Sequence, residues 1–281
     1  MKYVLYNPHS GNGQSKLYAE SLIDGDTTVV DMTEISDYAE FLGALESSDS
    51  VVICGGDGTL NRFVNDTAGV DVKCEILYMP TGTGNDFAAD IGKSGAREPF
   101  SLNEYISGLP EVTVDGRDYK FINGVGYGID GYCCEVGDSM KESGKQPNYT
   151  SIAISGLLFH YKPTAATVTV DGKEYRYKKV WIAPTMYGRH YGGGMIPTPE
   201  QKRGSEELSV MIFHGSGKLK TLMIFPSIFK GEHVKHEKHV TVHTGKEITV
   251  RFDEPRPLQI DGETHLGVKK YTAKAPVRAV L

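Results

Sequence analysis

The sequence predicts two domains, an α/β domain at the N-terminus followed by a domain built largely of β-strands. A chain of 281 residues is long enough for two domains that each bury a core. Residues 1–110 alternate short apolar runs with helix-like segments, the pattern of a parallel sheet flanked by helices. Beyond Asp115, β-branched and aromatic runs are separated by turn pairs such as Asp171-Gly172, which is typical of antiparallel hairpins.

The predicted elements of the first domain follow one another closely. Strands are expected at residues 2–6, 27–31, 50–54 and 74–79, and helices near 14–24, 36–46 and 58–68. In the second domain the β pattern covers residues 166–170, 175–183, 207–213, 238–243, 247–252 and 257–260, with one helix near 217–230. Helices thus alternate with strands only in the first domain.

Composition argues against several classes of function. The net charge is −6 at pH 7, which disfavours nucleic acid as a partner. The four cysteines lack the spacing of a zinc site and are expected to be reduced packing residues. The chain opens on a strand pattern rather than a signal peptide, and its longest apolar stretches, 152–159 and 222–229, fall short of the roughly 18 residues of a membrane span. We therefore expect a cytoplasmic protein whose membrane contact is peripheral, at the inner membrane face.

Three apolar strands of the first domain run directly into glycine-rich polar loops. The loops are Asn7-Pro8-His9-Ser10-Gly11, Gly55-Gly56-Asp57-Gly58-Thr59 and Pro80-Thr81-Gly82-Thr83-Gly84-Asn85-Asp86. All three should emerge at the carboxyl ends of parallel strands, where such sheets bind ligands, and should therefore converge. Backbone N–H groups without neighbouring side chains, together with helix N-termini, suit phosphate oxygens. The sequence therefore predicts a phosphate-binding site.

Asp57 is an unusual residue in such a loop. A carboxylate among phosphates is repelled unless a divalent cation or a proton stands between them, so Asp57 indicates a catalytic Mg²⁺ ion or a base. Asp86 in the third loop supports the same interpretation. Neither GxxxxGK[ST] nor a GxGxxG opening a first βα unit occurs, which disfavours Walker-type NTPases and dinucleotide dehydrogenases.

Together, these motifs resemble one superfamily. GGDGT at 55–59, NPxSG at 7–11 and PxGTxNDF at 80–87 are similar to the catalytic domain of diacylglycerol kinases, sphingosine kinases and bacterial soluble lipid kinases. The NAD kinases and phosphofructokinases are distant relatives that share the GGDGT loop. Four segments fit the lipid kinase branch in particular: Asn85-Asp86-Phe87, Tyr191-Gly192-Gly193-Gly194-Met195, Lys230-Gly231-Glu232-His233 and Asp261-Gly262-Glu263.

The resemblance runs from residue 3 to about residue 270 and carries implications for the fold. It implies a NAD kinase/phosphofructokinase-like α/β domain joined to a β-sandwich-like domain whose last strands return to the first domain. We therefore expect the nucleotide-binding domain at residues 1–114 with a returning segment at 268–281, and the acceptor domain at 115–267.

The resemblance also implies a nucleotide site for ATP and Mg²⁺. The nucleotide-binding residues that it implies are Asn7, Ser10, Gly11, Gly55, Gly56, Asp57, Gly58, Thr59, Thr81, Gly82, Thr83, Asn85 and Glu263. Asp57 is the expected ligand of the catalytic Mg²⁺, and Asp86 and Asp115 are expected to form a supporting acidic network. A turn before Gly116 explains Asp115 equally well.

Two aspartates compete for the role of catalytic base. In bacterial members of the family the aspartate of the DGE motif has this role, which corresponds to Asp261, whereas in sphingosine kinases it falls to the aspartate of the glycine loop, which corresponds to Asp57. Phosphoryl transfer through a loose transition state requires the acceptor hydroxyl to be oriented more than deprotonated, so an ordinary aspartate suffices. From the local pattern alone, Asp261-Gly262 is equally a hairpin turn.

One segment departs from the bacterial pattern. Bacterial relatives carry an Asp-Gly-x-Leu-Asp structural Mg²⁺ site, where this chain reads Ser205-Glu206-Glu207-Leu208-Ser209. Oxygen ligands for a hard cation are fewer here, so we expect this accessory site to be altered or empty.

The acceptor site is less clearly marked in the sequence. Residues 151–159 are apolar enough to line an acyl pocket, although a helix buried in the core has the same composition. A basic run that could meet anionic headgroups, or could be a solvated loop, comprises Lys230, His233, Lys235, His236, Lys238 and His239. The resulting prediction is an ATP-dependent lipid kinase with a diacylglycerol-like acceptor. Two alternative functions remain open: an NAD kinase-like enzyme, and a catalytically silent regulator that binds nucleotide or lipid. The chain could also form a homodimer.

Overall fold

The computed structural model of the protein describes residues 1–10 and 13–277 and divides the chain into two compact units. The first unit spans Met1–Leu109 and the second begins at Pro110. Each unit is described by itself below. No helix in the described part of the chain is both long enough and apolar enough to cross a membrane.

The first unit is an α/β domain with a five-stranded sheet in the order β2-β1-β3-β4-β5. Strands β1 to β4 are parallel, and β5 pairs antiparallel with β4. The strands are β1 (Lys2–Tyr6), β2 (Thr27–Asp31), β3 (Ser50–Gly55), β4 (Glu75–Pro80) and β5 (Phe100–Ser101). The helices are α1 (Ser15–Ser21), the 3₁₀ turn η2 (Met32–Glu34), α2 (Tyr38–Gly43), α3 (Asp57–Asp66), α4 (Asp86–Asp90) and α5 (Asn103–Ile106).

Apolar runs explain why the central strands of this sheet are largely buried. Val51 to Cys54 of β3 are almost fully buried, as is expected for a parallel strand covered on both faces. A cluster of Val4, Tyr6, Val52 and Cys54 with Ala19 of α1 forms part of its core. The sequence-predicted strands and the first three helices are confirmed, with shifts of a few residues at their ends.

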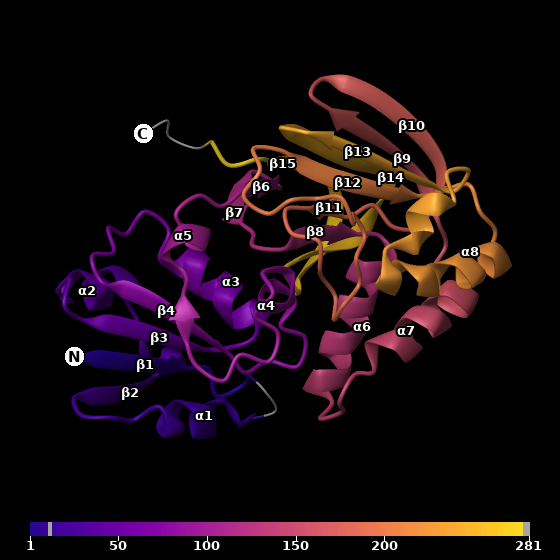
Figure 1. Cartoon of the computed structure of the whole chain (residues 1–281). Coiled ribbons are helices and arrows are strands. Elements are labelled where there is room, and N and C mark those ends of the chain that lie inside the picture. Colours follow the sequence, from indigo (N-terminus) through magenta and orange to yellow (C-terminus); the bar gives the residue numbers. More distant parts are fainter. Residues whose placement is uncertain (11–12, 278–281) are drawn as a thin grey trace. The chain divides into compact units, whose positions relative to one another are not determined.

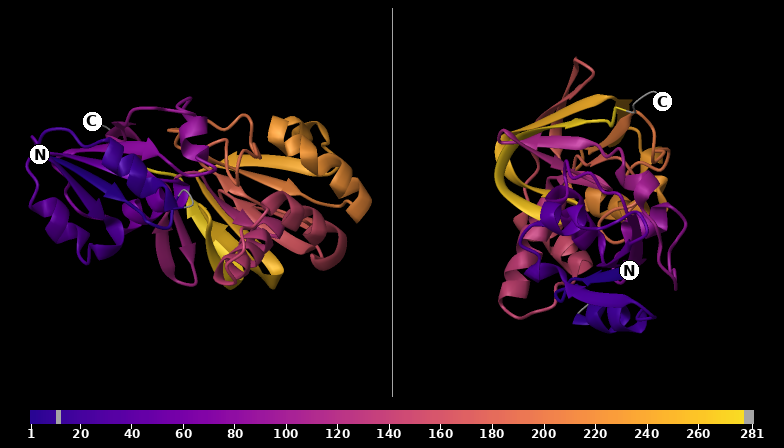
Figure 2. Two further views of the ribbon diagram at one scale, coloured as in Figure 1. Left: turned by 90° about the horizontal axis from the view of Figure 1, so that it is seen from below. Right: turned by 90° about the vertical axis from the view of Figure 1, so that its left-hand side faces the viewer.

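The second unit is organised around a ten-stranded antiparallel sheet. Its main path runs β13-β12-β11-β8-β14-β15-β6-β7, and β9, which pairs with β10, joins it through β14. The strands are β6 (Glu111–Val114), β7 (Arg117–Lys120), β8 (Gly124–Tyr127), β9 (Thr164–Val170), β10 (Lys173–Val180), β11 (Thr185–Met186), β12 (Leu208–Phe213), β13 (Val240–Gly245), β14 (Glu247–Ile260) and β15 (Glu263–Lys274). The two sequence-predicted strands at 247–252 and 257–260 are one long strand, because register shifts between Arg251 and Leu258 let β14 bend without ending. Figure 2 shows the resulting curved hairpin in yellow.

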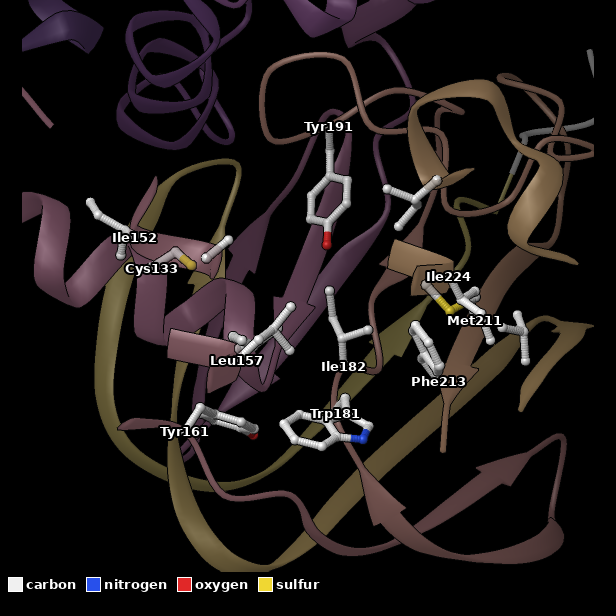
Figure 3. Packing of buried hydrophobic residues seen from close by; sticks show 14 of the residues in the cluster. Cys133, Ile152, Leu157, Tyr161, Trp181, Ile182, Tyr191, Met211, Phe213 and Ile224 are labelled. Carbon is white, nitrogen blue, oxygen red and sulfur yellow. The ribbon is translucent and has the colours of Figure 1, made fainter. Parts of the chain in front are cut away.

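Helices of the second unit enclose a second hydrophobic core. They are α6 (Ile129–Glu142), α7 (Tyr149–Ser155), the π-helical turn η3 (Gly156–His160), α8 (Lys218–Ile224) and the 3₁₀ turns η4 (Phe225–Lys230) and η5 (Glu232–Lys235). Leu157 of η3 and Ile224 of α8 pack with Trp181, Ile182 and other residues of this cluster (Figure 3). The helix predicted near 217–230 is thus an α-helix that continues as a 3₁₀ turn.

The boundary between the units differs from the expected one. Residues 111–114 form β6, which pairs with β7 and β15, so the division lies between Leu109 and Pro110 rather than after residue 114. The segment from residue 268 was expected to return to the first domain. Instead, residues 268–274 belong to β15 and pair with β14 and β6 of the second unit, because one uninterrupted hairpin supplies their hydrogen bonds.

Candidate functional site

The first glycine loop is hydrogen-bonded to the second at the carboxyl ends of β1 and β3. Ser10 Oγ accepts the backbone N–H of Gly56 at 3.1 Å. Asn7 Nδ2 donates to Thr59 Oγ1 at 3.2 Å, and Asn7 Oδ1 accepts the N–H of His9 at 3.0 Å. These side chains therefore shape the loops themselves. Gly11, the remaining expected residue of this loop, lies outside the described residues.

The second and third loops touch backbone to backbone. The N–H of Thr81 donates to the carbonyl of Gly55 at 2.9 Å. A Cβ on Gly82 would lie 2.5 Å from the Cα of Gly56, and a Cβ on Gly56 would lie 3.1 Å from the Cα of Gly82. A side chain at position 82 would therefore push the two loops apart, and one at position 56 would fit only if the third loop moved by a few tenths of an ångström. The three loops thus converge, as the sequence predicts.

Asp57 holds the third loop in place through α4. Its Oδ2 accepts the N–H of Asp86 at 2.9 Å, and its Oδ1 accepts the N–H of Phe87 at 2.8 Å. These are the first two N–H groups of α4, which have no partners within the helix. A negative charge at this place is favoured by the helix dipole. Asp57 is thus a helix cap contributed by a neighbouring loop.

Two polar atoms of the third loop are buried without a hydrogen-bond partner among the described residues. They are Thr81 Oγ1 and Asn85 Oδ1. Asn85 is held in the left-handed conformation, with φ of 50°, and its Nδ2 donates to the carbonyl of Gly82 at 2.7 Å. A buried polar atom without a partner costs about 1–3 kcal/mol, so such atoms indicate that a ligand completes the loop. The hydroxyl can donate to a phosphate oxygen, and the amide oxygen can accept from a ribose hydroxyl or water.

Asp261 is fixed in the second unit by three backbone groups. Its Oδ2 accepts the N–H of Ile122 at 2.5 Å, and its Oδ1 accepts those of Asn123 at 2.8 Å and Gly124 at 2.9 Å. The side chain is only 9% exposed. Asp261 also forms the β14–β15 turn with Gly262, and the φ angles of 46° and 100° suit an Asp-Gly hairpin turn. Asp261 is therefore both a residue of a hairpin turn and a carboxylate that backbone N–H groups hold in a fixed position.

Arg203 supports the segment that holds Asp261. Its Nη1 donates to the carbonyl of Ile122 at 2.6 Å, and its Nη2 donates to Asn123 Oδ1 at 2.8 Å. Its guanidinium also lies over the Tyr187 ring, 5.6 Å from the centroid. The sequence analysis did not identify Arg203. No pattern around residue 203 marks it, because its partners are about 80 residues away.

The remaining acidic residues occupy different environments. Asp86 is buried at the first position of α4, Glu263 is exposed at the first position of β15, and Asp115 is exposed in the β6–β7 turn with φ of 48°. The turn before Gly116 is thus the structural setting of Asp115.

Two serines and two glutamates lie in the segment Ser205–Ser209, which aligns with the accessory metal site. Ser209 Oγ donates to Gln201 Oε1 at 2.6 Å and lies 2.9 Å from Thr244 Oγ1, and Gln201 Nε2 donates to the carbonyl of Glu207 at 3.0 Å. These residues line a pocket of about 280 Å³. Within residues 1–10 and 13–277, no three His, Cys, Asp or Glu side chains are grouped so as to hold a metal ion. With serines at positions 205 and 209, the segment supplies fewer carboxylate oxygens than the bacterial site, and an altered or empty accessory site stays a prediction.

A buried carboxyl that the sequence analysis did not identify lies at the start of α6. Asp130 is 6% exposed, and burial raises its pKa from 3.8 to about 6. Tyr191 donates its hydroxyl to Asp130 Oδ2 at 3.1 Å, and Asp130 Oδ1 has no partner among the described residues. Figure 3 shows the Tyr191 ring and hydroxyl beside the hydrophobic cluster.

The two segments expected to contact lipid are partly buried in the second unit. Ile152, Ala153 and Leu157 are buried in the core, so the buried-helix alternative is correct for this face of residues 151–159. His233 is fully buried, with Nε2 2.9 Å from the carbonyl oxygen of Pro197, and burial lowers its pKa. It therefore cannot belong to an exposed basic run.

Comparison with known proteins agrees with this architecture. The family model of the diacylglycerol kinase catalytic domain matches residues 2–111, and that of the YegS C-terminal NAD kinase beta sandwich-like domain matches residues 123–278. A diacylglycerol kinase from Mycobacterium tuberculosis is 27% identical over 268 residues, covering 90% of this chain and 84% of the relative. One from Bacillus subtilis is 23% identical over 271 residues, covering 92% and 88%.

Solved structures share the fold. A chain from Bacillus anthracis superimposes with a TM-score of 0.68 at 18% identity and covers 100% of this chain and 96% of that chain. A diacylglycerol kinase structure from the same organism gives 0.61 at 16% identity, covering 98% and 93%. Because the two family models together account for both units of the chain, this protein belongs to the diacylglycerol kinase and lipid kinase family, with a diacylglycerol kinase catalytic domain followed by a YegS-type β-sandwich-like domain.

Proposed function

We propose that this protein is an ATP-dependent lipid kinase that transfers the γ-phosphate of ATP to a hydroxyl of a diacylglycerol-like acceptor. The observation that carries the proposal is the joined set of three glycine loops, in which Thr81 Oγ1 and Asn85 Oδ1 are buried and have no hydrogen-bond partner among residues 1–10 and 13–277. Family membership and relatives named diacylglycerol kinase support a kinase with a lipid acceptor.

The glycine loops would bind the nucleotide in this proposal. Backbone N–H groups of the second and third loops bind the phosphates, and the Thr81 hydroxyl donates a further hydrogen bond. Asp57 positions the third loop by capping α4. Mg²⁺ supplies charge neutralisation for the phosphates when it arrives with ATP, and this role requires few protein ligands. We propose Asp57 as the residue of this loop that would contact the Mg²⁺ ion.

Asp261 is the proton acceptor in this proposal. Its three N–H partners hold the carboxylate in one orientation, which favours a transfer that depends on positioning the acceptor hydroxyl. Ordinary basicity suffices because the proton leaves late in a loose transition state. Glu263, exposed two residues further along the hairpin, is proposed to contact the nucleotide.

A transfer assay tests the proposed function directly. Radiolabelled ATP is incubated with the full-length chain and diacylglycerol, monoacylglycerol, sphingosine, ceramide, polyprenol or NAD, with lipids in detergent micelles. Label in a lipid product, greatest with diacylglycerol, is the expected result. Label in NAD alone would replace the proposal by an NAD kinase activity, and no label in any acceptor would favour a silent binding protein.

A paired substitution tests the nucleotide site. Thr81→Val removes a hydroxyl that has no hydrogen-bond partner among the residues that the structure describes, so the free energy of unfolding should be unchanged or slightly higher. The dissociation constant of ATP, measured by calorimetry, should rise about ten- to a hundredfold because one hydrogen bond to a charged ligand is lost. Thr28→Val, at an exposed position of β2, is the control and should change neither quantity. An unchanged ATP affinity in Thr81→Val would remove Thr81 from the site.

A further inference from the structure

Five large apolar side chains are exposed on adjoining helical segments of the second unit. Leu219 and Met223 on α8 are 74% and 69% exposed, and Phe159 on η3 is 72% exposed. Ile154 on α7 and Phe229 on η4 are each 42% exposed. The segments adjoin because Lys218 Nζ at the start of α8 donates to the carbonyl of Leu158 in η3 at 2.7 Å. Figures 1 and 2 show α7 and α8 at the same end of the second unit.

The apolar residues of α8 are not a by-product of core packing. Ile224 faces the hydrophobic core and is 2% exposed, and Thr221 is fully buried. Leu219 and Met223 are four residues apart and therefore share another face of the helix, which a water-exposed helix would fill with polar residues. The same holds for η3, where Leu157 is buried and Phe159 is exposed. These segments are thus apolar on two sides.

The charge of these segments is opposite to that of the whole protein. The chain has a net charge of −6, yet residues 143–170 and 208–231 contain no Asp or Glu. The lysines of these two stretches are Lys145, Lys162, Lys218, Lys220 and Lys230. Arg256 donates to the Lys162 carbonyl and also to the Glu254 carboxylate. Glu254 therefore lies near the first stretch, but its charge is balanced by that of Arg256. Within these two stretches the five lysines are thus the only Asp, Glu, Lys or Arg residues, and Glu142 and Glu232 lie directly beyond their ends.

We infer that this surface, formed by Ile154, Phe159, Leu219, Met223 and Phe229, docks the protein onto an anionic lipid bilayer. An amphipathic surface of this kind buries its apolar side chains at the boundary between headgroups and acyl chains. Lys218 and Lys220 of α8 and Lys230 of η4 come from the same elements as the apolar side chains, so their long side chains can place ammonium groups at the level of the anionic headgroups. The inference rests on the proposed function, because a kinase with a diacylglycerol-like acceptor must reach an acceptor that resides in a bilayer.

The lysine fringe favours a bilayer over a second copy of the chain. A self-complementary interface would bring like charges together around the rim, since both copies would present the same lysines. An anionic bilayer neutralises them, and the flanking cations add to the apolar contact. The surface also differs from the basic run at 230–239, where His233 is buried and Lys235 pairs with Glu232 at 3.0 Å.

Vesicle co-sedimentation without ATP or acceptor tests this inference apart from catalysis. The full-length chain is mixed with phosphatidylcholine vesicles, with or without about 30% phosphatidylglycerol, and the bound fraction is measured across a salt titration. Binding should require the anionic lipid and weaken with salt. Leu219→Asp with Met223→Asp should lower the apparent partition coefficient by about tenfold or more. Lys220→Gln should lower it by about fivefold.

Matched controls separate a local surface from a general change in charge or hydrophobicity. Leu266→Asp alters an apolar residue of β15 that is 64% exposed, and Lys270→Gln removes an exposed lysine from the same strand. Neither should change vesicle binding. Circular dichroism and thermal unfolding verify that each variant is folded. Should the double aspartate variant fail to fold, the pair Leu219→Gln and Met223→Gln takes its place, since both side chains are exposed.

Defined outcomes overturn the inference. It fails if the wild-type chain does not bind anionic vesicles, or if the folded α8 variants bind as well as the wild type. It also fails if light scattering finds a dimer that the α8 substitutions dissociate while wild-type vesicle binding is absent, because a second copy would then cover the surface. The proposed kinase activity is judged separately by transfer in detergent micelles, so either proposal can fail alone.

Discussion

Asp57 in the first unit and Asp261 in the second are both held by backbone N–H groups, yet they organise the chain over very different distances. Asp57 binds N–H groups 29 and 30 residues away, in the next glycine loop. Asp261 binds three N–H groups 137 to 139 residues away, at the start of β8. The first contact assembles neighbouring loops, whereas the second joins the last hairpin to the beginning of its unit.

The surroundings of the two aspartates also differ. Around Asp57, the third loop has buried atoms of Thr81 and Asn85 that have no hydrogen-bond partner in the described part of the chain, as is expected where a ligand completes the site. Around Asp261, protein N–H groups engage both carboxylate oxygens and hold the side chain at 9% exposure. The third loop therefore has polar atoms that a bound ligand would hydrogen-bond, whereas the position of the Asp261 carboxylate is determined by hydrogen bonds within the protein. The following substitutions test this difference, beginning with the largest expected effect.

Asp261→Asn should have the largest effect on turnover. The amide retains one oxygen, but its NH₂ group would face at least one backbone N–H, so the free energy of unfolding should fall by about 2–3 kcal/mol. If Asp261 is the base, kcat should fall by about 10²–10⁴-fold with ATP affinity little changed. Kinetics at a temperature where the variant is fully folded provide the measurement.

Asp171→Asn is the matched control for this substitution. Asp171 also has positive φ and also precedes glycine in a hairpin turn, and its Oδ1 accepts the N–H groups of Lys246 and Glu247, each at 2.9 Å. Asparagine can keep both bonds, so stability and kcat should both be unchanged. A folded Asp261→Asn variant with kcat within about threefold of wild type would transfer the role of base to Asp57.

Gly82→Ala should separate the glycine loops. The added Cβ would lie 2.5 Å from the Cα of Gly56, so one loop must move, at a cost of about 1–3 kcal/mol. We expect ATP binding to weaken by at least about tenfold, because the displaced backbone no longer converges on the phosphates. Calorimetry and chemical denaturation measure the two effects. Gly43→Ala, where a Cβ meets no atom within 4 Å, should leave both unchanged or raise stability slightly. Equal ATP affinity in the two variants would contradict the loop assignment.

Asp57→Asn should have a smaller effect on stability. One oxygen becomes an NH₂ group that faces an N–H of α4, so the free energy of unfolding should fall by about 1–2 kcal/mol. The KM for Mg·ATP should rise and the Mg²⁺ dependence should shift if Asp57 also contacts the metal. Asp37→Asn is the control, because Asp37 caps α2 through Oδ1 alone and asparagine can replace it. A pure fall in kcat with an unchanged Mg²⁺ response would identify Asp57 as the base instead.

Asp130→Asn should remove a pH dependence of the free energy of unfolding. Burial raises the pKa of Asp130 from 3.8 to about 6, so the folded state binds more protons than the unfolded state between these values. Its contribution therefore favours folding at low pH and is lost as the pH rises toward and through about 6. The variant should be more stable than wild type by about 3 kcal/mol near pH 7.5, with little gain near pH 4. Denaturation curves across this pH range measure the difference, and a constant offset at every pH would reject the assignment.

The sequence alone was sufficient to predict the α/β domain and its converging loops. The central strands β1, β3 and β4 are largely apolar runs, and each glycine loop follows one of them directly, so local patterns predict both the sheet and the edge where the loops meet. The helix α6 was missed. Its signal was the apolar spacing of Ile129, Cys133, Val136 and Met140, which Gly131 and Gly137 interrupt. Those glycines are explained only by close neighbours, since a Cβ on Gly131 would lie 2.1 Å from the carbonyl oxygen of Pro257.

Only the tertiary structure decided which groups meet at the candidate site. The N–H partners of Asp261, the contact between Gly56 and Gly82, and the guanidinium of Arg203 beside Asn123 all join segments that are distant in the chain. Periodicity and turn chemistry depend on a few neighbouring residues and are therefore readable in the sequence. A hydrogen bond or a close backbone approach between distant segments depends on where the whole fold carries each of them, so no local pattern specifies it.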